Sequence, residues 1–143
     1  MLQIETSVDI NRPVEQVAEF FSDNENALLW QTGLLETRLT SEPNRVGSTW
    51  TDVVKVLGRR IELSFVVTEY EPEAKFAFKS TAGSIPVSGS YTMEPVGDGA
   101  RVIFALEGEP GGFFRLAEPI VRRVTLRQWE ANLANLKDLL EAD

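Results

Sequence analysis

The stretch 59-RRIELSFVVTEYEPEAKFAFKSTA-82 alternates apolar and polar residues on both sides of a Glu71-Pro72 turn. A period of two is typical of a strand with one buried face, and two such runs joined by a short turn predict an antiparallel hairpin. The large apolar side chains share one face of this hairpin: Ile61, Leu63, Phe65, Val67, Phe76 and Phe78. The opposite face is polar, so we expect one side of the sheet to meet water.

Similar segments lie on both sides of this hairpin. We expect strands over residues 2–10, 35–41, 48–57, 59–71, 75–82, 87–94 and 100–107, with Gly-, Pro- and Asn-containing turns between the later ones. Pro13 suits the first turn of a helix after the first strand, and a second short helix is expected to end at Trp30, before Gly33. Gly89 falls on the apolar face between Val87 and Tyr91, where a missing side chain allows sharp curvature or close approach of another element.

The chain closes with a helical pattern over residues 113–140 that carries two apolar stripes. One comprises Leu126, Trp129, Leu133, Leu136 and Leu140, and the other comprises Phe113, Leu116, Ala117, Ile120 and Val124. The stripes lie about half a turn apart, so one straight helix cannot bury both. Either the helix bends or breaks near Pro119, or Ile120 and Val124 are exposed and meet a partner such as a second copy of the chain. In the straight case Phe114, Glu118, Val121, Arg122 and Thr125 face the interior.

Composition excludes several kinds of site. The chain has 143 residues, a net charge of −8, no cysteine and no histidine. An acidic chain is a poor ligand for nucleic acid, and without His or Cys we expect no metal site and no cofactor. The N-terminal stretch does not resemble a signal peptide and no apolar run is long enough for stable membrane insertion. We therefore expect one cytoplasmic domain over residues 1–143.

These segments resemble the START-like or SRPBCC superfamily, whose members include polyketide cyclase/dehydrase-like proteins. The resemblance covers essentially the whole chain and rests on fold signatures rather than catalytic motifs. Its carriers are Arg12 to Val17 with Phe20, Trp30, Gly47 before Trp50, Gly58 to Leu63, Glu69 to Pro72, Gly89 to Glu94, and the closing helix. The resemblance implies an α+β helix-grip fold, in which a curved seven-stranded antiparallel sheet wraps around a long C-terminal helix and two short helices link the first two strands.

The resemblance also implies a largely apolar cavity between sheet and helix. We expect this cavity to bind a small or medium hydrophobic molecule that is lipid-like, polyketide-like or aromatic. The expected lining comprises Trp30, Trp50, Phe65, Phe76, Phe78, Tyr91, Met93, Phe104, Phe114, Val121, Thr125 and Trp129. The alternative is a purely structural role, in which these aromatic residues fill a core without a cavity.

Two other functions stay open at this point. A cyclase or dehydratase would need acid–base groups in the same cavity, and the candidates are Asp52, Glu69, Tyr91 and Arg122. Asp52 shares a strand face with Trp50, and Glu69 continues the apolar register of the hairpin. The alternatives are a bulge that turns Asp52 outward and a strand end that leaves Glu69 in solvent. The third function is an interaction module that acts through a homodimer surface at Ile120 and Val124.

Overall fold

A computed structural model of the chain describes residues 2–83, 85–109 and 113–142. Its strands are β1 (Leu2–Ile10), β2 (Leu34–Leu39), β3 (Thr49–Val56), β4 (Arg59–Glu71), β5 (Lys75–Ala82), β6 (Val87–Val96) and β7 (Gly99–Gly108). Its helices are α1 (Val14–Ser22), the 3₁₀ helix η1 (Asn24–Asn26), α2 (Ala27–Trp30), α3 (Phe113–Leu116) and α4 (Glu118–Glu141). The bounds of β4 and β5 are those expected from the alternating pattern.

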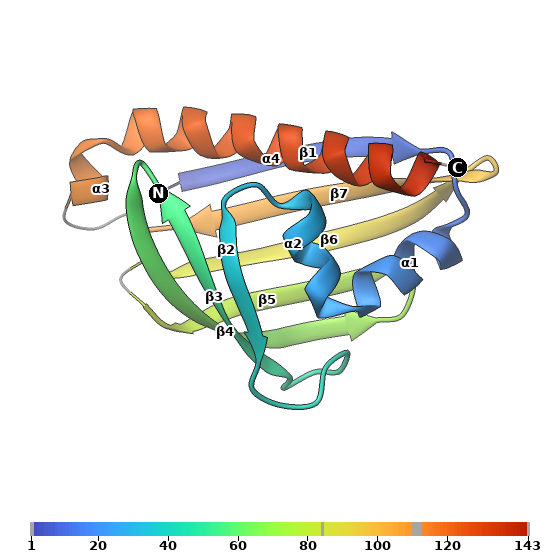
Figure 1. Cartoon of the computed structure of the whole chain (residues 1–143), viewed down its shortest axis with the longest axis horizontal. Helices are drawn as coiled ribbons and strands as arrows, with labels where there is room; N and C mark the ends of the chain where they lie inside the picture. Colours follow the sequence, from blue (N-terminus) through green and yellow to red (C-terminus); the bar gives the residue numbers. More distant parts are fainter. Residues whose placement is uncertain (1, 84, 110–112, 143) are drawn as a thin grey trace.

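The strands form one seven-stranded antiparallel sheet in the order β1-β7-β6-β5-β4-β3-β2. Helix α4 packs along β1 and lies across the sheet, while β2, β3 and β4 curl round one side (Figure 1). The helices α1, η1 and α2 link β1 to β2, which are the two edge strands. This arrangement confirms the predicted helix-grip fold.

Two local features bend the sheet around the helix. Strand β4 carries register shifts between Ser64 and Phe65 and between Val67 and Glu69, and such bulges increase strand twist. Gly89 on β6 pairs directly with Phe78 on β5. A Cβ atom at Gly89 would lie 2.7 Å from Cζ of Phe78 and 2.9 Å from the carbonyl oxygen of Ala105. The glycine therefore permits the close approach that its position on the apolar face predicted.

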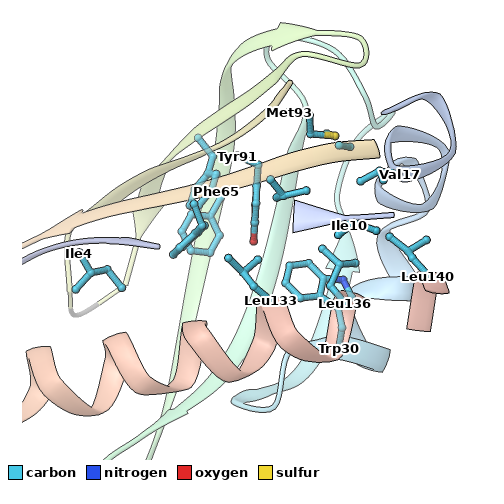
Figure 2. Packing of buried hydrophobic residues seen from close by; sticks show 14 of the residues in the cluster. Ile4, Ile10, Val17, Trp30, Phe65, Tyr91, Met93, Leu133, Leu136 and Leu140 are labelled. Atoms are coloured by element: carbon cyan, nitrogen blue, oxygen red, sulfur yellow. The ribbon is translucent and has the colours of Figure 1, made fainter. Parts of the chain in front are cut away.

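The filled part of the core lies under the C-terminal half of α4. Figure 2 shows Leu133, Leu136 and Leu140 pointing from α4 toward the sheet, with Ile10 and Val17 beside Leu140. These side chains are almost completely excluded from solvent; Leu136 and Val17 are 0% exposed. Branched aliphatic side chains thus close this end of the molecule.

The C-terminal helical segment is broken near Pro119. A bend or break there was one of the two alternatives that its two apolar stripes predicted. The chain leaves helical geometry at Ala117, and Pro119 lies in the first turn of α4, where its missing N–H costs nothing. Ile120 and Val124 are nevertheless 59% and 41% exposed, so the break does not bury the second stripe. No described helix is both long and apolar enough to cross a membrane.

Candidate ligand cavity

A cavity of about 240 Å³ lies between the sheet and the N-terminal half of α4. By this measure a single water needs roughly 10–15 Å³, so the space is far larger than a packing defect. Every residue of the expected lining borders it except Phe114, whose side chain lies outside the described residues. The cavity reaches the surface beside the exposed residues Asp23, Glu71 and Glu73, which we call the acidic rim.

Aromatic rings from strands β3 to β6 build the sheet side of the cavity. The ring of Trp50 stacks on Phe65 at a centroid distance of 5.1 Å, and it lies 5.7 Å from Phe76 and 5.8 Å from Phe78. Alternate residues of a strand point to one face, so consecutive strands bring these rings together on the concave side. Rigid rings in mutual contact favour a wall that keeps its shape.

Helix α4 supplies the opposite side through Val121, Thr125 and Trp129. These residues recur every four positions and therefore share one helix face. The indole of Trp129 stacks on the ring of Phe104 at 3.8 Å with an interplanar angle of 17°. Trp129 thus marks the boundary between the hollow region and the filled core.

Asp52 places a carboxyl group in the wall of the cavity. Trp50 donates its indole Nε1–H to Oδ2 of Asp52 over 3.1 Å, while the buried Oδ1 accepts no hydrogen bond from the described residues. Burial raises the pKa of Asp52 above its ordinary value, and the nearby hydroxyl of Thr37 and indole of Trp50 offset part of this rise. Thr37 stands directly opposite Asp52 in the β2–β3 ladder. A bulge does not turn Asp52 outward, so this candidate is inside.

Tyr91 places a hydroxyl group in the same cavity. The side chain is buried, and its oxygen accepts a hydrogen bond from Nε2 of Gln31 over 3.4 Å. Burial raises the pKa of Tyr91 well above its usual range, and the nearby charge of Asp52 adds to the effect. The hydroxyl therefore stays protonated at neutral pH and remains a hydrogen-bond donor.

The other two acid–base candidates lie outside the cavity, which corrects the sequence-based expectation. The bulge between Val67 and Glu69 shifts the register of β4, and Glu69 turns into solvent, where its Oε2 pairs with Nζ of Lys75 at 2.8 Å. Arg122 lies on an exposed flank of α4 beside β1, and its Nε donates to the carbonyl oxygen of Gln3 over 3.2 Å. Neither residue can act on a molecule inside the cavity from these positions.

Several polar residues near the cavity were not anticipated. Asn132 of α4 is 2% exposed and accepts hydrogen bonds from the backbone N–H and the hydroxyl of Thr32. This contact ties α4 to the segment that carries Gln31, the partner of Tyr91. The acidic rim was also missed. The available signal was an Asn on the apolar side of a leucine-rich helix that also carries Asn135, because buried polar residues usually have a partner.

The acidic groups are dispersed rather than clustered. Among residues 2–83, 85–109 and 113–142 no three carboxyl groups are placed to hold a metal ion together. Asp52 and Tyr91 are instead suited to hydrogen bonding and proton transfer, in a wall that is otherwise mostly apolar.

Comparison with known proteins adds a family match. A family model described as polyketide cyclase / dehydrase and lipid transport matches residues 1–141. No curated protein matches the chain significantly in sequence.

Solved structures with the same fold come from several bacteria. The protein TTHA0849 from Thermus thermophilus has a TM-score of 0.85 and 19% identity, with 96% of each chain covered. A START superfamily protein from Mycobacterium smegmatis has a TM-score of 0.79 and 15% identity, with 99% of this chain and 98% of that chain covered. The Zhui aromatase/cyclase from Streptomyces sp. R1128 has a TM-score of 0.78 and 14% identity, with 97% of this chain and 93% of that chain covered. At these identities the similarity establishes the fold.

Proposed function

Because this chain belongs to the polyketide cyclase / dehydrase and lipid transport family, we propose that it binds a small or medium hydrophobic molecule in the cavity under the N-terminal half of α4. The ligand class is lipid-like, polyketide-like or aromatic. The observation that carries this proposal is the cavity itself, which opens beside the acidic rim and is walled by the rings of Trp50, Phe65, Phe76 and Phe78. Such walls bind through shape and apolar contact.

A second candidate function is acid–base catalysis of the cyclase or dehydratase type. One observation favours it: Asp52 is a carboxyl group with a raised pKa in the cavity wall, close enough to Tyr91 for its charge to act on that hydroxyl. Raised carboxyl pKa values are typical of general acids and bases. Glu69 and Arg122 have no part in this candidate mechanism. Binding is the first proposal because it needs only the cavity, whereas catalysis also needs a substrate placed against Asp52.

The binding proposal can be tested with a pair of variants on adjacent residues of α4. Thr125→Phe fills the cavity, whereas Val124→Phe places the same ring on the exposed face of the helix. The probe is N-phenylnaphthylamine, an uncharged molecule whose fluorescence rises in apolar surroundings. We expect saturable binding of one probe per chain by the wild type and by Val124→Phe, and roughly tenfold or greater weakening by Thr125→Phe.

Far-UV circular dichroism and the thermal midpoint confirm that both variants are folded. Equal probe affinity of folded Thr125→Phe and wild type would place the binding site elsewhere. Failure of the wild type to bind the probe in a saturable manner would contradict the binding proposal itself.

A further inference from the structure

The geometry of the wall points to the class of ligand: we propose that the cavity selects hydrophobic molecules with a hydrogen-bond donor, a hydroxyl or an amine, and disfavours hydrophobic carboxylates. The carboxyl group of Asp52 is the specificity-determining residue. This inference rests on the proposed binding function and adds what the polar end of the ligand must be.

The carboxyl group of Asp52 has unused hydrogen-bond accepting capacity. An ionised carboxyl group offers about four lone-pair positions. The indole of Trp50 fills one of them at Oδ2, the Thr37 hydroxyl lies beside the group, and Oδ1 accepts nothing within hydrogen-bond distance from the described residues. Since buried acceptors are costly when unfilled, a donor brought by a ligand is stabilised here.

Asp52 lies among apolar neighbours in the cavity wall. Its strand neighbours on the same face are Trp50 and Val54, and all three border the cavity. A ligand whose hydrocarbon body contacts the rings of Trp50 and Phe76 therefore brings any polar substituent near this carboxyl group. Few polar groups in such a wall fix the orientation of the bound molecule.

The charged residues that line the cavity are mostly acidic. Four acidic residues border the cavity, namely Asp52 and the acidic rim of Asp23, Glu71 and Glu73. Lys75 is the single cation in the described lining, and its Nζ is paired with Glu69 at 2.8 Å. A carboxylate ligand would meet like charges without a free cation in that lining to compensate them. An amine or a hydroxyl meets no such repulsion.

The test uses naphthalene probes that share one ring system and differ in a single substituent: methyl, hydroxymethyl, aminomethyl or carboxylate. Affinities are measured by calorimetry at about pH 8, where carboxylate probes are ionised. The variants are Asp52→Leu, which removes the acceptor and the charge, and Asp52→Asn, which keeps an acceptor and removes the charge. The methyl probe reports whether the cavity of each variant is intact.

We expect the affinity of the hydroxymethyl and aminomethyl probes, relative to the methyl probe, to fall at least tenfold in Asp52→Leu, which is the effect of one hydrogen bond to a charged group. In Asp52→Asn the hydroxymethyl preference should persist, while the carboxylate probe should gain roughly tenfold relative to the methyl probe. The Asn variant also carries the test if Asp52→Leu does not fold.

Two results would overturn the inference in distinguishable ways. If the wild type and both variants bind the methyl probe and show the same relative affinities for all substituents, Asp52 does not select the ligand, and the binding function stands. If the wild type binds none of the probes, the inference and the binding function both fail.

Discussion

The two halves of α4 cover different kinds of interior. Toward the C-terminus, Leu133, Leu136 and Leu140 pack against Ile10 and Val17. All five aliphatic side chains are almost completely buried. Toward the N-terminus the same helix presents Val121, Thr125 and Trp129 to a cavity. The C-terminal half of α4 thus covers a packed core, which we call the packed half of the molecule. Its N-terminal half covers the cavity, which we call the hollow half.

The difference lies in the sheet opposite each half. Under the C-terminal half, the end of β1 at Ile10 and helix α1 at Val17 place branched side chains against the leucines of α4. Under the N-terminal half, the bulges of β4 and the Phe78–Gly89 pair curve the sheet, and the facing residues are flat rings in contact with one another. Aliphatic side chains interdigitate with the helix in the packed half, whereas the curved wall of rings in the hollow half borders the cavity.

The largest expected effect falls on the packed half. Leu136 is 0% exposed, and Leu136→Ala should lower the free energy of unfolding by about 2–5 kcal/mol, because it opens a cavity that rigid neighbours cannot close. Leu139→Ala is the matched control on the same helix, since Leu139 is 42% exposed, and it should cost less than about 1 kcal/mol. Urea denaturation measures both. Equal losses would mean that this half is not packed as described.

An intermediate effect is expected where the sheet bends. Gly89→Ala places a methyl group against Phe78 and the backbone of Ala105, and it should cost about 1–3 kcal/mol through overpacking. Because the ring of Phe78 must move into the hollow half, probe binding should weaken as well. Ser88→Ala, one residue away on the exposed face, should change stability by about 0.5 kcal/mol or less. If Gly89→Ala leaves both stability and probe binding unchanged, the curvature of the sheet does not depend on Gly89.

The smallest effect is a pH dependence in the hollow half. Burial raises the pKa of Asp52 in the folded chain above its ordinary value of 3.8, with Thr37, Trp50 and Tyr91 around it. The folded state therefore holds this proton more tightly than the unfolded state. The stability contributed by Asp52 is fully present below pH 3.8 and is lost as the pH rises through the raised pKa.

Asp52→Asn should remove this contribution. The difference in the free energy of unfolding between wild type and variant should then favour the wild type more at the acidic end of the window than above it. Urea titrations across this pH range measure the difference. A difference that stays constant, or that moves in the opposite direction, would contradict a raised pKa.

The sequence predicted the apolar stripe that carries Leu133, Leu136 and Leu140 and the apolar face of the sheet, because both follow from periodicity. The alternation of residues 59–82 predicted the bounds of β4 and β5 and the face that carries Phe65, Phe76 and Phe78. Gly89 was recognised as a place of curvature or close approach, because it interrupts an apolar face. Such patterns can be recognised from neighbouring residues alone, without knowledge of contacts between distant segments.

The site residues that the sequence misplaced or missed have one cause in common: their positions depend on contacts between segments distant in the sequence. Glu69 follows the apolar register in sequence, yet the bulge that turns it outward is set by the pairing of β4 with β5. Arg122 lies near the cavity side of α4 on a helical wheel, yet β1 occupies that flank and accepts its hydrogen bond. The contacts of Gln31 with Tyr91 and of Asn132 with Thr32 could not be predicted, because they join segments 60 and 100 residues apart.

The most direct test of the two-region account is methyl NMR of the wild type during titration with N-phenylnaphthylamine. We expect shifts of the methyl resonances of residues that border the cavity: Val54, Val56, Ile61, Leu63, Val87 and Val121. We expect little change in the packed half, at Ile10, Val17, Leu133, Leu136 and Leu140, or on the exposed residues Ile120 and Val124. Saturable shifts confined to the packed half or to Ile120 and Val124, with the cavity methyl groups unchanged, would contradict the account.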